Sequence, residues 1–430
     1  MSCYPQHLTE LVSTEILLRL PVNSLLRFRC VCKAWRDTID NDFFVRAHLR
    51  AAQNTFTLIA PHVKADGMIT AAGLYRWEQG AKAADDDDRN TAAAAGVYPW
   101  EQDTATLVHP MGADYSVPGT TNVSHDLAHC DGLVLVPSDA MVRVLNPATR
   151  RVLVLPLRPP HAVMFGSTPF GFEGHQAFGL GHDPRSKAYK VARFFYRSME
   201  GPVGNPNHYT LGMEVLTVGA ADLRWRETAA PPPYPALPGR TATFFKDSLL
   251  WTVEELLFRE APGFIRFKLE DESFAVLPGP PCSPSLDYAA ASLAELRGEL
   301  CVCVARHEAD YGHGWHETWI CRDLDDAPPP RWEPRHVVEM IPTFPRLRCL
   351  RPIAAYTDVL VLHAEPCYLC RETQEPGRSK DLAREKERNT PLHMQLKLRY
   401  YHPDTGMFVE YPAATCAFQV ISYVPSLVPV

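Results

Sequence analysis

Apolar residues near the start of the chain recur at helical spacing. Between residues 8 and 49, Val12, Ile16 and Leu20 fall on one face of a helix, and further leucines widen the apolar perimeter. Pro21 ends this helix, because proline lacks the amide donor that the next turn would need. The pattern predicts three short helices, at residues 8–20, 22–29 and 32–40.

From about residue 55 the pattern changes to short alternating runs separated by turn residues, which predicts strands. Aspartate, asparagine, proline, serine and glycine favour turn geometry that branched side chains resist, so they separate the two strands of a hairpin. Two further units, around Trp225 and Trp332, fit this pattern less regularly. The regular hairpins are predicted at residues 142–155, 178–195, 264–277 and 396–411.

Units that recur every 40 to 55 residues or so, with several strands each, are typical of propeller blades. About six such units fit after residue 55, and a strand near residues 418–424 is available to close the ring against the first. The sequence therefore predicts a mainly β protein with a small N-terminal α domain and a β-propeller-like domain of about six blades. The alternative fold is a packed β-sandwich pair with long insertions.

The predicted division of the chain has three parts. Residues 1–50 form the helical domain, residues 51–118 a connector and first β unit, and residues 119–430 the propeller-like domain. A run of four aspartates at 85–88 and the alanines at 92–95 read as an exposed low-complexity loop inside the first β unit.

Three short helices bury too little surface to hide more than one apolar face. Exposed apolar surface costs roughly 25 cal/mol per Å², so the remaining face needs a cover. Two covers are open: a partner's helices, or the chain's own β domain.

Composition narrows the class of protein. With 430 residues, 46% of them hydrophobic, and a net charge of −7, the chain has no positive field that would attract nucleic acid. We expect no membrane span and no secretory signal, because apolar runs stay well below about 18 residues. Scattered cysteines, 12 in all, predict reduced thiols in the cytoplasm or nucleus.

Residues 8–36 read LTELVSTEILLRLPVNSLLRFRCVCKAWR, and this string resembles the plant F-box motif almost throughout. The chain departs from that motif at Thr9, where proline is usual, and at Asn41-Asp42-Phe43-Phe44, which replaces Asp-Pro-x-Phe. The resemblance implies binding to the Skp-type adaptor of an SCF (Skp, cullin, F-box) ubiquitin ligase. The implied adaptor-binding residues are Leu8, Leu11, Ile16, Leu20, Pro21, Leu25, Val31, Cys32, Lys33 and Trp35.

The β part is similar to the plant F-box-associated domain. The resemblance rests on residues 124–135, on Asn146-Pro147-Ala148-Thr149 and on residues 178–191. It implies a protein-interaction domain, so that the chain would be a non-catalytic substrate receptor that links an unknown protein target to the adaptor and a cullin. Two alternatives remain: a non-degradative F-box scaffold, and a β-propeller lectin or enzyme with a helical appendage.

Other polar clusters predict no cofactor and no metal site. The loop at residues 307–317 holds three histidines and three acids, which could bind a divalent cation, but their spacing fits a solvated turn. Cys367 and Cys370 lack the second cysteine pair that structural zinc requires. Gly179-Leu180-Gly181 lacks the third glycine and the helix of a dinucleotide loop, so it is read as the start of a hairpin. As target-binding loops, the sequence favours residues 307–317 and 231–235.

Overall fold

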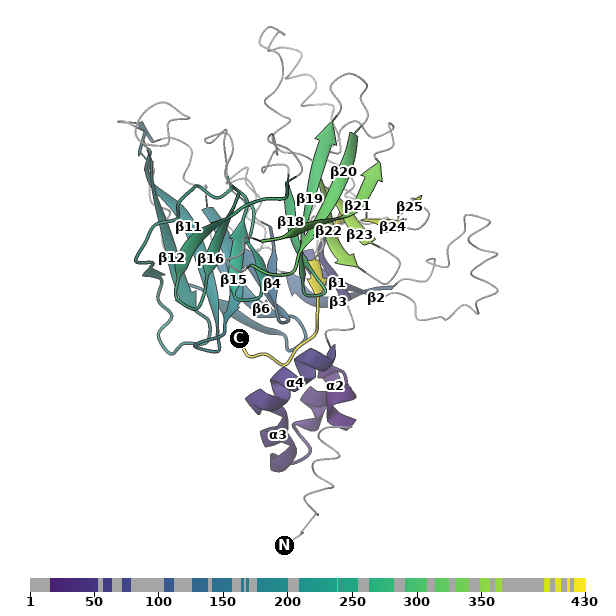
Figure 1. Ribbon diagram of the computed structural model, residues 1–430. Helices are drawn as coiled ribbons and strands as arrows, with labels where there is room; N and C mark the ends of the chain where they lie inside the picture. The colour runs from purple at the N-terminus through teal and green to yellow at the C-terminus, as the bar shows by residue number, and fades with distance from the viewer. Residues whose placement is uncertain are drawn as a thin grey trace.

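The structure is a computed structural model with a small helical unit beside a large ring of β-sheets (Figure 1). It describes residues 16–52, 57–63, 72–78, 104–111, 126–137, 141–156, 164–165, 168–169, 176–199, 209–237, 239–253, 263–281, 291–307, 314–324, 330–339, 349–355, 360–365, 398–402, 407–410, 416–417 and 421–430.

The helical unit contains one 3₁₀ turn and three α-helices among the described residues. They are η2 (Leu17–Arg19), α2 (Val22–Phe28), α3 (Lys33–Ile39) and α4 (Asp42–Ala52). The predicted helices at 22–29 and 32–40 correspond to α2 and α3, and most of the predicted helix at 8–20 lies outside the described residues. The sequence reading missed α4 as a helix. Phe44, Val45, His48 and Leu49 form its buried face, at the i, i+4 spacing of a helix.

The described strands form six large sheets, which we call blades 1 to 6, and a two-stranded sheet of β8 (Met164–Phe165) and β9 (Thr168–Pro169). All strand pairs within the blades are antiparallel.
Blade 1 is β1 (Thr57–Val63), β2 (Ala72–Glu78), β3 (Thr104–Met111), β26 (Cys416–Ala417) and β27 (Ile421–Tyr423).
Blade 2 is β4 (Ala128–Cys130), β5 (Leu133–Pro137), β6 (Val142–Asn146) and β7 (Arg151–Val154).
Blade 3 is β10 (Gln176–Asp183), β11 (Ala188–Met199), β12 (Tyr209–Thr217) and β13 (Arg226–Glu227).

Blade 4 is β14 (Thr243–Phe245), β15 (Ser248–Trp251), β16 (Phe264–Lys268) and β17 (Ser273–Leu277).
Blade 5 is β18 (Ser292–Leu296), β19 (Glu299–His307), β20 (Gly314–Cys321) and β21 (Trp332–Glu339).
Blade 6 is β22 (Cys349–Ala355), β23 (Leu360–Glu365), β24 (Leu398–His402) and β25 (Met407–Glu410).

The six blades form a closed ring. The first strand of each of blades 2 to 6 contacts its neighbours in the ring, and β27 takes the corresponding place in blade 1, in the cyclic order β4, β10, β14, β18, β22, β27 and back to β4. Blade 1 takes its inner strands from the C-terminal end of the chain, because β27 pairs with β1 through Ile59 and Ile421. A closed ring leaves no end blade with an exposed face, and only short, protected strand edges remain. The prediction of a six-bladed propeller closed by residues near 418–424 is confirmed, and the packed sandwich pair is wrong.

The four predicted hairpins coincide with β6–β7, β10–β11, β16–β17 and β24–β25. Three of them share a turn device, in which a residue with positive φ precedes the second strand: Arg150, Lys187 and Glu272. In the first two, an Asn146 or Asp183 side-chain oxygen also accepts a backbone N–H two residues on. The turn chemistry read from the sequence therefore sets the hairpin register.

Tryptophans join neighbouring blades along the outside of the ring. The Trp225 indole N–H, just before β13, donates to the carbonyl of Pro156, just after β7. The Trp332 indole, at the start of β21, donates in the same way to Pro278, just after β17. Blades 2 and 3 are therefore joined by the same kind of contact as blades 4 and 5, through the tryptophans of the two units that fit the hairpin pattern less regularly.

A buried ionic network joins blade 3 to blade 4. The Lys190 ammonium lies 2.8 Å from the Asp183 carboxylate and 3.1 Å from that of Glu272, and it donates to the Leu269 carbonyl. Arg226 completes the network from β13, 2.5 Å from Glu272. Removal of one partner from such a network leaves a charge without compensation, which is costly in a buried place.

This network predicts an acid-sensitive ring. Burial opposes ionisation of Asp183, but hydrogen bonds from Lys190 and Ser186 outweigh it and lower the pKa to about 2. Because the folded pKa lies below the unfolded value, the stabilisation is complete above about pH 5 and is lost as pH falls from about 4 to 2. We expect a loss of about 2 kcal/mol from this group, measured by urea unfolding across that range. In an Asp183→Asn variant the difference from wild type should be largest above pH 5 and should vanish at the acid end. A difference in unfolding free energy that stays constant with pH would contradict the assignment of this acid sensitivity to Asp183.

Candidate functional site

The helical unit has its own small core. Leu17, Leu25, Ile39 and Phe44 are buried together, with Phe28 packed against them from α2. Trp35 also contacts this core and meets Phe28 edge to face, with 5.1 Å between the ring centroids. The first turn of α3 begins at Cys32, whose sulfur accepts the backbone N–H of Trp35. The helices are therefore held at fixed angles around an apolar centre.

Large apolar side chains remain on the surface of this unit. Ile16 is 50% exposed, Val31 is 61% exposed and Phe43 is 81% exposed. Among the residues whose side-chain burial the structure describes, three other large apolar side chains are exposed by 40% or more, and they lie on blades 2 and 5: Val152, Val154 and Val337. The short helical unit thus carries as many exposed large apolar residues as all the ring residues whose burial is described.

The structure divides the ten residues implied as adaptor contacts into four groups. Leu8 and Leu11 lie outside the described residues. Leu20 and Trp35 are half-buried, and Leu25 is completely buried, so Leu25 supports the helical core and offers no contact surface. Direct contact of Leu20, Trp35 and the exposed members with an adaptor stays a prediction. The exposed members are Ile16, Pro21, Val31, Cys32 and Lys33.

Phe43 is a candidate that the sequence reading missed. It precedes Phe44 in the stretch Asn41-Asp42-Phe43-Phe44, and the two rings have opposite environments, because Phe44 is buried in the helical core. The Asn41 side chain accepts the backbone N–H of Phe43 and so fixes the start of α4. The spacing of Phe44 and His48 along a helix is the signal that would have placed Phe43 outside.

The opposite side of α4 rests on the ring. Val45 and Leu49 belong to the apolar core of blades 2 and 3, together with Leu133 and Val191. In Figure 1, α4 is the helix nearest to the ring. The helical unit is therefore covered on one side by the chain's own β domain, while the side chains described above stay open. Of the two covers that the sequence left open, the chain's own β domain accounts for one side of the helical unit, and a partner as the cover of the exposed side chains stays a prediction.

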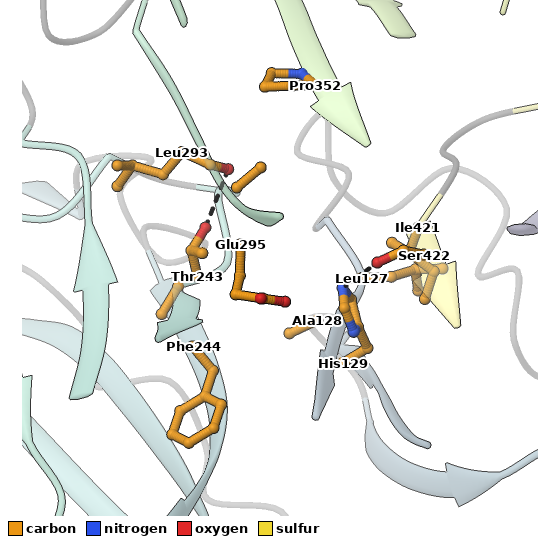
Figure 2. Close-up of a pocket in the computed structure, with 12 residues that line it drawn as sticks. Leu127, Ala128, His129, Thr243, Phe244, Leu293, Glu295, Pro352, Ile421 and Ser422 are labelled. Atoms are coloured by element: carbon orange, nitrogen blue, oxygen red, sulfur yellow. Dashed lines mark hydrogen bonds between the residues drawn. The ribbon is translucent and has the colours of Figure 1, made fainter. Parts of the chain in front are cut away.

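The inner strands of the ring line a small cavity. Its lining includes His129 from β4, Thr243 from β14, Glu295 from β18 and Ser422 from β27 (Figure 2). Thr243 donates to the Leu293 carbonyl, and burial raises the pKa of the Glu295 carboxyl. No group of three or more histidine, cysteine or acidic residues that could hold a metal ion occurs among the described residues.

The polar loop predicted at 307–317 is only partly visible. Residues 308–313 lie outside the described residues, and the flanking positions belong to β19 and β20. Glu317 accepts hydrogen bonds from the indoles of Trp315 and Trp319, both at 3.2 Å. The pair Cys367 and Cys370 also falls outside the described part. At residues 231–235, Tyr234 packs against the core of blades 3 and 4.

The glycine pair of β10 has a packing role. A Cβ on Gly179 would lie 2.9 Å from the Trp251 ring, and one on Gly181 would lie 2.6 Å from Leu269. The bulky neighbours Phe178 and Leu180 point to the other side, into the core shared with blade 2. Small residues on one face of β10 let blade 4 approach closely, which confirms the reading of this segment as part of a hairpin.

Comparison with known proteins places both parts of the chain. Residues 97–343 match the F-box associated beta propeller domain, and residues 6–46 match the F-box domain. The F-box/kelch-repeat protein At2g43270 of Arabidopsis thaliana is 26% identical over 246 residues, which are 55% of this chain and 93% of that protein. The F-box/LRR-repeat protein At2g43260 of the same plant is 25% identical over 298 residues, which are 68% of this chain and 59% of that protein.

Among solved structures, the β-propeller domain of the Trilobed protease from Pyrococcus furiosus is similar at 12% identity and a TM-score of 0.30, with 68% of this chain and 72% of that chain covered. No helix in the described residues is long and apolar enough to cross a membrane.

The molecule has two parts, a helical unit with open apolar side chains and a six-bladed ring. The chain belongs to the F-box-associated β-propeller family and carries an F-box domain. This combination supports a general role as a substrate receptor of SCF-type ligases.

Proposed function

We propose that the chain is the substrate-recognition subunit of an SCF-type ubiquitin ligase. The F-box helices bind a Skp-type adaptor, which connects them to a cullin, and the ring binds a protein target. The observation that supports this most directly is the exposure of Ile16 and Val31, since both lie within the F-box match. Large apolar side chains at such positions, beside a packed core, suit a protein-docking surface.

In this role the chain performs no chemistry on the target. One end is held by the adaptor and the other holds the target, so target lysines are kept close to a conjugating enzyme that carries ubiquitin. The contribution is a raised effective concentration, which accelerates transfer without any catalytic side chain of the receptor.

Co-purification tests the proposal. The full chain, mixed with recombinant Skp-type adaptor and cullin, is expected to elute with both in one stoichiometric complex on size exclusion. The full chain is the suitable bait, because removal of residues 1–50 would take away Val45 and Leu49 and uncover the ring surface beneath α4. Failure of the folded wild-type chain to bind the adaptor would defeat the proposal.

Affinity capture from cells with mass spectrometry then addresses the target. A matched bait with Ile16→Asp and Val31→Asp should lose the adaptor and cullin and keep the target, because both side chains are exposed on the helical unit and belong to none of the ring's described cores. Depletion of the chain should make that target accumulate. A target whose level stays constant would favour the non-degradative scaffold instead.

A further inference from the structure

A short segment after β27 lies between the ring and the helices. Residues 424–430, which we call the strap, leave blade 1 and pass along the ring beside α4 (Figure 1). The Asn146 side-chain amide donates to two strap carbonyls, those of Ser426 at 3.1 Å and Val428 at 2.8 Å. Asn146 and Ser426 are both completely buried, so these bonds form in a place that water does not reach.

The turn between β4 and β5 is shaped for the strap as well. Gly132 has φ +82°, and a Cβ at this position would lie 2.3 Å from the Ser426 hydroxyl oxygen and 2.5 Å from the Val424 carbonyl oxygen. Only glycine permits both the backbone conformation and this close approach. Two sequence landmarks of the β domain, the Asp131-Gly132-Leu133 turn and the Asn146-Pro147 turn, thus hold the strap on blade 2.

The other side of the strap contacts the F-box helices. Leu427 packs against the helical core around Leu17 and Leu25, and also against the core of blades 2 and 3. Val428 is buried in that second core together with Val45 and Leu49 of α4. One residue of the strap therefore contacts both parts of the molecule at once.

Arg46 provides a second tie between α4 and the ring. Its guanidinium lies 2.9 Å from the Nε2 atom of His182 and donates to the Lys187 carbonyl at 3.3 Å. Burial, together with the Arg46 charge, lowers the pKa of His182, so this imidazole is neutral at pH 7 and its Nε2 can accept the bond. The Tyr189 ring packs edge to face on His182 and keeps it in place.

We propose that the strap is a positioning segment, which fixes the angle between the F-box helices and the ring. The inference rests on the proposed function for its purpose, because a ring held at one angle keeps a bound target at one distance from the conjugating enzyme. Leu427 is a positioning residue because it packs on both cores, and Arg46 holds α4 to the ring through separate contacts. A loosened ring would spread the target over a larger volume and lower its effective concentration.

Energy transfer between two fluorophores on the full chain tests the tie itself. Suitable positions are Asp37, which is exposed on α3, and Arg331, whose side chain is 90% exposed beside β21. Noncanonical amino acids at these positions avoid the native cysteines. Wild type should give one narrow distance distribution, and Leu427→Asp should widen it. Pro429→Asp is the matched control, since Pro429 is exposed in the same segment, and it should behave as wild type.

Arg46→Met gives an independent variant if Leu427→Asp does not fold, with Arg50→Met, exposed on the same helix, as its control. Equal widths for Leu427→Asp, Arg46→Met and wild type would overturn the tie. Adaptor binding should change less than about twofold in Arg46→Met and in the two control variants, because none of these residues belongs to the helical core or to the exposed adaptor surface.

A reconstituted ligase tests the positioning role. Self-ubiquitination of ring lysines is mapped by mass spectrometry, and the ratio of the most to the least modified lysine should fall about tenfold in Leu427→Asp. An unchanged ratio together with a widened distance would overturn the positioning role. Absence of any assembly with the adaptor would instead defeat the proposed function. The distance measurement would still decide whether the strap fixes the helices to the ring.

Discussion

Replacement of Trp251 by alanine is expected to lower the free energy of unfolding of the ring by about 3 to 5 kcal/mol. The indole is buried in the core between blades 3 and 4, and its N–H donates to the Phe178 carbonyl at 3.1 Å. The loss leaves a cavity that Gly179 cannot fill, because this neighbour has no side chain. Urea unfolding at pH 7 measures the change.

Trp251→Phe separates packing from hydrogen bonding at this position. It keeps most of the apolar volume and removes the donor, so the loss should be roughly 1 to 2 kcal/mol. The Phe178 carbonyl also accepts the Ala242 backbone N–H, which limits the cost. Phe43→Ala is the control for an exposed aromatic residue and should leave ring stability unchanged. A Trp251→Ala variant as stable as wild type would show that the two blades are not closely packed.

The pair Ile16→Asp and Val31→Asp is expected to weaken adaptor binding about 100-fold or more, because each places a charge in an apolar contact. Isothermal titration with the purified adaptor gives the affinity. These positions are better probes than Leu20 and Trp35. The latter two pack on the helical core, so loss of either side chain would also loosen the helices. Surface substitutions of this kind should change the stability of the helices by only about 0.5 kcal/mol.

Val152→Asp and Val154→Asp make the matched control for this pair. Both valines are exposed to a similar degree, at 40% and 50%, but they lie on β7 of the ring. Adaptor affinity should equal that of wild type. A similar loss from the ring pair, or an unchanged affinity in the Ile16 and Val31 variant, would contradict the placement of the docking surface on the helices.

The hairpins were predictable because their determinants are local. The turn before Arg151 and the one before Ala188 each depend on a single Asn or Asp whose side chain bonds a backbone group two residues away. Strand pairing follows directly from such a turn, since the register is set at its first residue pair. The blade count follows from the recurrence of these units, and closure of the ring follows from the cost of unpaired edges.

The contacts between the two parts were not predictable in the same way. Asn146 reads as a turn residue, and its turn role is confirmed, but the same side chain also bonds carbonyls some 280 positions further along the chain. Nothing near residue 426 in the sequence indicates this partner. The burial of Leu25 and the exposure of Val31 likewise depend on how three helices cross, which apolar spacing alone does not determine.

The place of β27 in blade 1 has a consequence for synthesis on the ribosome. The helices emerge before the ring, but the surface that receives α4 is completed by residues 421–428, which follow the other blades in the chain. Until then β1 lacks its inner neighbour and Val45 and Leu49 have only part of their cover. A nascent chain therefore displays the exposed apolar side chains of its helices for most of the time that the ring takes to form, and such transiently uncovered surface favours aggregation.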